Sequence, residues 1–344
     1  MSRFKLIFAI ILICIASTSC AIFEGRKKDD QSNCVPGNIM AAYFIDRSGT
    51  DPHALSVSFE IMSPYTKDYC NGFRFIIAGV SDEYVPWPKN VTAWQDAFSA
   101  QAWLESALQP YRGIFDLQTS VNTFFTLPQY SSYDPQSSRP PFAVIYAFSD
   151  TVNGINNLLN GISRLTSEGY TVLLIASQLT RYKVSQLLQV LPQSNIMSTD
   201  SPAYSSVWLT NRFDAGYTVP ITNQTGTSGY ITSPNYPNNY ESADLREYYI
   251  TAPSTYNAIL LTIDDFDINW HSDTALFVYQ GSIMDDDDYL YTWDRSITGK
   301  NFTIPSNAVT LRFFSDLSDA FKGFNISWTA ISNPPEEKSD NSIG

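Results

Sequence analysis

The sequence contains little histidine and none of the familiar hydrolase or nucleotide-binding motifs. Its two histidines are His53 and His271. It has no His-Glu-x-x-His pattern of a zinc protease, no Gly-x-Ser-x-Gly turn of a serine hydrolase and no Gly-Lys-Ser/Thr phosphate loop. These absences argue against a histidine-dependent enzyme and leave a pair of carboxylates as the open catalytic alternative.

Basic residues are also scarce, with 21 Lys+Arg against 34 Asp+Glu and a net charge of −13. Nucleic acids and anionic membranes attract proteins through basic patches, so we expect neither as a main partner. The chain is 44% hydrophobic and 14% aromatic, which favours packed cores and strand-rich, extracellular-type surfaces. Because single cores stop growing near ~250 residues, 344 residues suggest two domains.

No apolar run is long enough to span a bilayer, which takes ~20 residues. The run Leu6–Ala16 follows two basic residues and leads through small residues to Cys20. This order is typical of a secretory signal peptide, which we predict at residues 1–20. A membrane anchor or a lipoprotein cysteine at Cys20 is the alternative. The mature protein is then expected to be secreted, without membrane insertion, with a spacer at 21–35 and a polar tail at 332–344.

Cysteine is scarce too, because Cys14 and Cys20 would leave with the signal peptide. The remaining pair, Cys34 and Cys70, is expected to form a disulfide in an oxidising compartment. Asn-x-Ser/Thr sequons fit the same compartment and predict a secreted glycoprotein. The predicted glycosylation sites are Asn90, Asn223, Asn301 and Asn325.

The first part of the chain alternates continuous apolar runs with helical stripes. The runs, each typical of a strand buried on both faces, are Met40–Ile45, Phe73–Val80, Phe142–Phe148 and Tyr170–Ala176. An apolar helical stripe spans Ile155–Leu165 and stops at Gly169, a second spans Val184–Leu191, and a short strand is expected at 195–199. This order predicts an α/β doubly wound, mainly parallel sheet with helices on both faces, in which ligands bind beyond the carboxyl ends of the strands.

Polar residues with metal-ligand chemistry follow two of these strands. The first strand runs into Asp46-Arg-Ser-Gly-Thr50, and the strand at 142–148 runs into Ser149-Asp-Thr151. With these motifs, residues 36–205 resemble the von Willebrand factor type A (VWA) domain, whose metal-ion-dependent adhesion site is built from such loops. The resemblance implies a Mg²⁺ or Ca²⁺ ion held by hard oxygen ligands. The residues that it assigns to this ion are Asp46, Ser48, Thr50, Thr119 and Asp150.

The same residues have a structural alternative, because Asp and Ser commonly cap helices and Asp46 and Ser48 would precede one. The cysteines bear on the strand assignment. Cys34 precedes the first strand and Cys70 the second, so in a parallel sheet both lie at the amino edge, opposite the predicted metal.

The last part of the chain loses the helical period and shows short alternating strands. Apolar residues alternate along Ile259–Ile263, Val309–Phe313 and Phe324–Trp328, with Thr310 and Arg312 pointing outward, which predicts a β-sandwich. The motifs Gly229–Tyr240, Ile250-Thr-Ala-Pro253, Phe266-Asp-Ile268, Leu276–Gly281, Phe314-Ser-Asp316 and Gly323-Phe324 resemble those of a CUB domain in the same order. The resemblance covers 216–331, implies an all-β two-sheet jelly-roll sandwich, and leaves 206–215 as a linker.

Many CUB domains hold Ca²⁺ at one end with acidic side chains. Here Asp316 matches, whereas Asn269 replaces the family's Glu and Thr274 its Asp, with Asp273 beside it. The resemblance therefore implies at most a partial Ca²⁺ site at Asp273 and Asp316, with an Asp-rich edge loop as the alternative. The run Asp285–Asp288 is interpreted as a solvated loop, or else as a contact for a cation or a basic partner.

The two resemblances together imply a secreted, non-enzymatic recognition or adhesion glycoprotein. Its expected partners are extracellular proteins or glycans, some proteins of this arrangement being linked to innate defence. The alternatives are a matrix component without a metal-dependent ligand and a glycan-processing enzyme with a CUB accessory domain.

Overall fold

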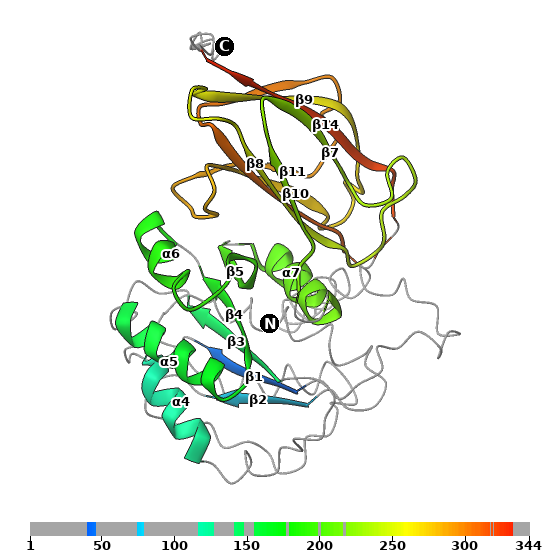
Figure 1. Cartoon of the computed structure of the whole chain (residues 1–344). Coiled ribbons are helices and arrows are strands. Elements are labelled where there is room, and N and C mark those ends of the chain that lie inside the picture. Colours follow the sequence, from blue (N-terminus) through cyan, green and yellow to red (C-terminus); the bar gives the residue numbers. More distant parts are fainter. Residues whose placement is uncertain are drawn as a thin grey trace, which may run out of the picture.

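The computed structural model describes residues 40–45, 74–78, 116–126, 141–147, 155–176, 179–198, 201–215, 218–316, 318 and 320–332. These residues form an α/β layer followed by a β-sandwich, which lie against each other (Figure 1). The predicted fold class is therefore confirmed.

The α/β layer is built on a five-stranded parallel sheet with the strand order β2-β1-β3-β4-β5. Its strands are β1 (Met40–Ile45), β2 (Arg74–Ala78), β3 (Phe142–Ala147), β4 (Thr171–Ala176) and β5 (Ile196–Ser198). All residues of β3 are buried, as a continuous apolar run requires when both faces of a strand are covered. All five lie within or match the strands predicted from the sequence.

Helices cover this sheet and connect its strands. They are α4 (Leu117–Thr126), α5 (Ile155–Ser167), α6 (Arg181–Leu187), the short 3₁₀ helix η3 (Gln193–Asn195) and α7 (Pro202–Ala215). α5 buries the predicted stripe at Leu158, Ile162 and Leu165. Gly161 lets α5 pack closely on α4: a Cβ at this position would lie only 2.6 Å from the Leu117 side chain.

The segment 206–215, which the sequence analysis predicts as a linker, is instead part of α7. Trp208, Arg212 and Phe213 on this helix are each 0% exposed. Phe213 packs edge-on against Phe142 of the parallel sheet. On the other side, α7 contacts β8 and β13 of the sandwich, so it is buried from two directions. A helix covered from two directions does not show the single apolar stripe by which the other helices were predicted.

The sandwich consists of two sheets that together match the predicted all-β jelly roll. One sheet, with the order β11-β10-β13-β8-β6, contains β6 (Ile221–Thr225), β8 (Leu245–Thr251), β10 (Ala275–Gln280), β11 (Tyr289–Trp293) and β13 (Ala308–Phe314). The other, with the order β12-β9-β14-β7, contains β7 (Ser228–Thr232), β9 (Ala258–Asp267), β12 (Asn301–Ile304) and β14 (Gly323–Ile331). The alternating residues predicted to face inward are buried in its core.

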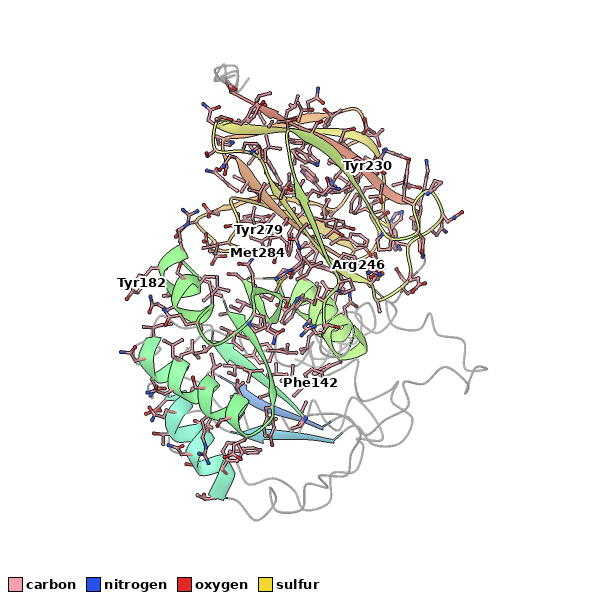
Figure 2. The ribbon with its side chains drawn as sticks, in the orientation of Figure 1. Phe142, Tyr182, Tyr230, Arg246, Tyr279 and Met284 are labelled. Carbon is pink, nitrogen blue, oxygen red and sulfur yellow. The ribbon has the colours of Figure 1, made fainter. Side chains whose placement is uncertain are left out.

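The outer face of the sheet that contains β13 is covered by the α/β layer. Phe277, Tyr279, Met284 and Phe314 belong to the same apolar cluster as the core of the parallel sheet. Figure 2 shows Tyr279 and Met284 where the sandwich meets the α/β layer. Arg312 points away from the sandwich core, as predicted, yet it is 0% exposed because the other domain covers it. The core of the α/β domain therefore continues onto the outer face of this sheet, whereas the interior of the sandwich is a separate apolar cluster.

Candidate functional site

The edge of the parallel sheet that carries the predicted metal site is formed by two adjacent strands. β1 and β3 pair in parallel, with Phe44 opposite Ile145 and Ile45 opposite Tyr146. Their carboxyl ends therefore reach the same edge of the sheet. The predicted ligands that follow these ends, Asp46, Ser48, Thr50 and Asp150, lie outside the described residues, as do Cys34, Cys70, His53 and Asn90.

The fifth predicted ligand, Thr119, lies in the first turn of α4. Its backbone N–H donates to Asp116 Oδ1 at 2.7 Å, and Asn157 Nδ2 of α5 donates to the same oxygen at 2.8 Å. Burial acts to raise the pKa of the Asp116 carboxyl, but hydrogen bonds from Thr119 and Asn157 outweigh it and lower that pKa. Asp116 thus caps α4 and ties it to the start of α5, which follows the carboxyl end of β3.

Asp116 was missed by the sequence analysis. The available signal was its position directly before an apolar helical stretch, three residues before the threonine whose N–H it accepts. Thr119 therefore lies in the first turn of α4, where its N–H donates to the capping Asp116. The sequence analysis expected this threonine in the loop before the helix.

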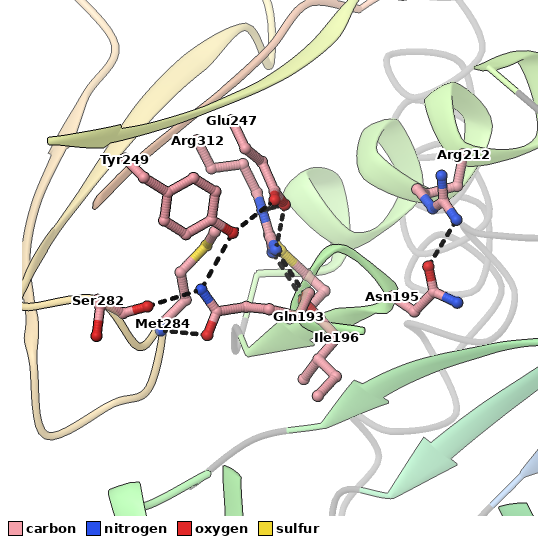
Figure 3. Close-up of polar contacts among 10 residues, drawn as sticks. Gln193, Asn195, Ile196, Arg212, Glu247, Tyr249, Ser282, Met284 and Arg312 are labelled. Atoms are coloured by element: carbon pink, nitrogen blue, oxygen red, sulfur yellow. Dashed lines mark hydrogen bonds and ion pairs between the residues drawn. The ribbon is translucent and has the colours of Figure 1, made fainter. Parts of the chain in front are cut away.

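A buried ion pair lies at the centre of the contact between the domains (Figure 3). Arg312 on β13 donates to Glu247 Oε1 on β8 through Nε at 3.0 Å and Nη2 at 2.7 Å, and both side chains are at most 1% exposed. The guanidinium also donates to the backbone oxygens of Ile196 at 2.7 Å and Gln193 at 3.0 Å, which belong to the α/β domain. One arginine therefore joins the outer face of the sandwich to the segment that leads into β5.

The surroundings of this pair raise the pKa of both groups that flank the carboxylate. Burial on its own would lower the pKa of Arg312, but the Glu247 charge, the nearby Tyr279 and Tyr249 and the hydrogen bond to Glu247 together outweigh it and raise that pKa, so the guanidinium stays charged. Tyr249 donates its hydroxyl to Glu247 Oε2 at 2.8 Å. Burial, with the Glu247 charge adding to it, raises the pKa of Tyr249, so this hydroxyl stays a donor.

Both polar atoms of the Gln193 side chain, in η3, form hydrogen bonds to the sandwich. Its Nε2 donates to Tyr249 Oη at 3.2 Å and to the Ser282 backbone oxygen at 3.1 Å, and its Oε1 accepts from the Met284 N–H at 3.2 Å. On the same side, Asn211 of α7 donates to the backbone oxygen of Ser315 at 2.8 Å. These bonds fix the orientation of one domain on the other through directional contacts rather than apolar packing alone.

The acidic run Asp285–Asp288 is a third part of the domain contact. Asp286 accepts from the Leu179 N–H at 2.6 Å and from Ser198 Oγ at 2.5 Å, and Asp287 accepts from the Arg181 N–H at 2.8 Å. Ser198 ends β5, and Leu179 and Arg181 follow β4, so the run lies at the carboxyl edge of the parallel sheet.

The two ends of this run are buried, in contrast to the solvated loop that the sequence suggested. Asp288 pairs with Arg181, and Asp285 lies 3.6 Å from the same guanidinium and is 0% exposed. Burial raises the pKa of Asp285, and the Arg181 charge only partly offsets it. The alternative, a contact with a basic group, applies at these two residues, and the group is an arginine of the same chain.

At the predicted calcium end of the sandwich, Asp273 and Asp316 lie close enough to repel each other. Burial and the Asp316 charge raise the pKa of Asp273. Among the described residues there is no group of three or more His, Cys, Asp or Glu side chains placed to hold a metal ion. Beside this end, Trp270 is 61% exposed and its ring lies tilted against that of His271, with ring centroids 3.3 Å apart.

The sequons of the sandwich lie on strands. Asn223 on β6 and Asn301 on β12 are exposed, whereas Asn325 on β14 is partly buried. Asn301 pairs with Thr262, which pairs with Ser327, so the sequons of Asn301 and Asn325 share the outer face of the sheet that is turned away from the α/β domain.

Comparison with known proteins identifies the sandwich. Residues 221–328 match the model of the CUB domain. Over 112 residues, this part of the chain is 34% identical to cubilin from Canis lupus familiaris and 32% identical to human cubilin, matches that cover 31% of this chain. The chain corresponds to only 3% of the length of these relatives.

Solved structures resemble the chain at lower identity. The CUB1-EGF-CUB2 domain of human MASP-1/3 is 24% identical, covering 33% of this chain and 42% of that one, with a TM-score of 0.29. Proximal thread matrix protein 1 from the mussel byssus, with a zinc-occupied MIDAS motif, is 12% identical, covering 63% of each chain, with a TM-score of 0.42.

CUB domains occur in extracellular proteins and generally bind protein ligands there. Within the described parts of the chain, no helix combines the length and the apolar character that crossing a bilayer demands.

Proposed function

We propose that this protein is a secreted recognition or adhesion protein without enzymatic activity, which binds extracellular proteins or glycans through its α/β and CUB domains. The α/β domain would bind an acidic group of its ligand through a divalent ion held by Asp46, Ser48, Thr50 and Asp150. Carboxylate and hydroxyl oxygens are suited to Mg²⁺ or Ca²⁺, and a ligand set with few charges leaves the ion able to accept a further carboxylate.

The observation that carries this proposal is the parallel pairing of β1 with β3. Because the two strands are neighbours in one sheet, the chain leaves both of them at the same edge, and an ion shared by the residues that follow them requires this arrangement. The start of α4, with Asp116 and Thr119, is tied to the start of α5 after β3, which supports Thr119 as a neighbour of that edge.

The contact between the domains supports a joint binding surface. The acidic run of the CUB domain lies on the residues that follow β4 and β5, so the CUB domain borders the same edge of the sheet. A ligand bound at this edge would contact both domains. Because the two domains are held in one fixed orientation, less entropy is lost when the ligand binds the second domain.

Secretion belongs to the same proposal, with a signal peptide at 1–20, glycans at the four sequons and a Cys34–Cys70 disulfide. A bridge across this separation would stabilise the fold by roughly 3–4 kcal/mol. Peptide mapping under non-reducing conditions should recover the linked cysteine peptides. Glycosidase treatment of the protein from a secreting cell should raise its gel mobility, and each Asn→Gln variant of a used sequon should remove one step.

Calorimetry with Mg²⁺, Mn²⁺ or Ca²⁺ tests the metal-dependent binding. The wild-type chain and Asp267→Ala, which removes an exposed carboxylate at the end of β9, should bind the ion equally. Asp46→Ala should abolish the binding. Identical heats in Asp46→Ala and the wild type would refute the metal site.

Capture experiments address the ligand. From extracellular fluid, the wild type should retain partners that EDTA and Asp46→Ala both release. The family resemblance extends the proposal to innate defence, which binding to microbial surfaces would test in the same format. Retention that depends on neither EDTA nor Asp46 would favour a matrix component instead, and turnover of polysaccharides or peptides would favour an enzyme.

A further inference from the structure

The end of the CUB domain where calcium is expected is closed by its own side chains. It is formed by Tyr240, by the loop 269–274 between β9 and β10, and by Asp316 and Ser318 after β13. Asn269 is 7% exposed and Thr274 is 0% exposed, so both are interior parts of this end rather than surface side chains.

Asp316, the one acidic position that matches the family, already has its inner oxygen occupied. Asp316 Oδ1 accepts from the Ser318 N–H at 3.1 Å, from Ser318 Oγ at 2.6 Å and from Thr274 Oγ1 at 3.4 Å. A carboxylate oxygen offers two lone pairs, which three donors from its own chain fully use.

Thr274 stands where the family has an aspartate, and its hydroxyl is equally engaged. Thr274 Oγ1 donates to Asp316 Oδ1, accepts from the Asp316 N–H at 3.2 Å and lies 3.1 Å from Ser272 Oγ. An aspartate here could only accept, and would place a second charge against Asp316 that a cation must balance. The threonine instead donates a hydrogen bond to Asp316 and carries no charge, so no cation is needed to balance it.

Asn269 stands where the family has a glutamate, and it directs a donor into this end of the domain. Its Nδ2 donates to Ser318 Oγ at 2.8 Å, while its Oδ1 accepts from the His271 N–H at 3.2 Å. The Asn269 N–H in turn donates to Tyr240 Oη at 3.1 Å. An amide NH₂ repels a cation at the position where a glutamate would bind one.

These contacts form one chain of hydrogen bonds, from Asn269 through Ser318 to Asp316 and Thr274. It joins the loop before β10 to the residues after β13. In a CUB domain that has the family's three acidic side chains, a bound ion would make the same connection. Calcium takes 6–8 oxygen ligands, and the carboxylates described here are Asp316 and the neighbouring Asp273. We infer that hydrogen bonds replace calcium at this end of the CUB domain, so that its fold is independent of calcium.

Thermal unfolding of the full chain, with calcium or with EDTA, tests this inference. All variants are made in the Asp46→Ala background, which removes the proposed metal site of the α/β domain. Calcium should leave the unfolding temperature of this background within about 1 °C of its value in EDTA. Ser318→Ala, which breaks the hydrogen-bonded chain, should lower the unfolding temperature equally in both conditions.

Restoring the family's acidic residues gives the opposite expectation. Asn269→Glu combined with Thr274→Asp should unfold at a lower temperature in EDTA and gain roughly 2–4 °C in millimolar calcium, because only this variant would bind the ion. If the double variant fails to fold in EDTA, recovery of folding in calcium is the same result. Thr274→Asp alone serves as a milder version.

Two results would overturn the inference. A calcium-dependent rise in the Asp46→Ala background that Asp316→Asn abolishes would show an ion bound at this end. Absence of any calcium response in both acidic variants would show that Asn269 and Thr274 are not what excludes it.

Discussion

Replacing Arg312 with methionine would remove the group on which the contact between the domains is centred. The guanidinium donates twice to Glu247 and twice to backbone oxygens of the α/β domain. Methionine keeps much of the volume but offers no donor. Glu247, which is 0% exposed, would be left as a buried charge without its cation.

The expected loss follows from what is left unpaired. Removing one partner of a buried ion pair costs about 3–5 kcal/mol, because the remaining charge stays in a low-dielectric environment. Both side chains here are at most 1% exposed, so solvent screening gives little relief. The double variant Glu247→Leu/Arg312→Met removes both charges and should recover much of this loss, because paired apolar substitutions of buried ion pairs are often near neutral.

Calorimetry and denaturant unfolding measure this loss in the free energy of unfolding and show which domain is destabilised. The wild type should unfold in one transition, since one apolar cluster spans the contact between the domains. Arg312→Met should unfold at a lower temperature and denaturant concentration, and in two transitions. The control is Arg295→Met, whose side chain is 79% exposed beside Asp294 and should change stability by less than about 0.5 kcal/mol. A loss in Arg312→Met no larger than in this control would refute the reasoning.

Three further substitutions have measurable outcomes. Asp116→Ala should destabilise α4 by about 0.5–2 kcal/mol in denaturant unfolding, because it removes a helix cap. Asp286→Ala should cost about 1–3 kcal/mol in the same assay, because it leaves the Leu179 N–H without its acceptor. Asp273→Asn should raise the unfolding temperature at neutral pH, and this gain should vanish below the ordinary pKa of 3.8.

The sign of the Asp273 prediction follows from its raised pKa. Burial and Asp316 raise it, so between 3.8 and that higher value the folded chain binds more protons than the unfolded one. The free energy of unfolding therefore falls as the pH rises through this window. Asparagine cannot ionise and removes this dependence. An unfolding temperature of Asp273→Asn that runs parallel to the wild type at all pH values would contradict the assignment.

Most of the architecture could be predicted because each strand shows its burial in its own residues. β3 is apolar throughout since both of its faces are covered, and β9, β13 and β14 alternate since one face lines the sandwich. The helix α5 shows a single stripe because only one of its sides is buried. In these elements a local pattern carries all the information that the fold requires.

The contact between the domains could not be predicted in the same way. Alternation along β13 places Arg312 on the outer face but does not say what covers that face. The acidic run finds its partners in backbone N–H groups after β4, which no side-chain pattern reveals. The helix α7 is buried from two directions and therefore lacks a single apolar stripe. Without that stripe, its sequence looks like a connecting segment.

The position of α7 determines where this chain can be divided. A fragment beginning after Ala215 would keep both sheets of the CUB domain but lose the helix on which they rest. It would expose Phe277, Tyr279 and Phe314 to solvent, a contiguous apolar surface of the kind that promotes aggregation. Any recombinant version of the CUB domain should therefore keep the α/β domain on which it rests, because a cut between β3 and β4 would expose the buried strand β4 in turn.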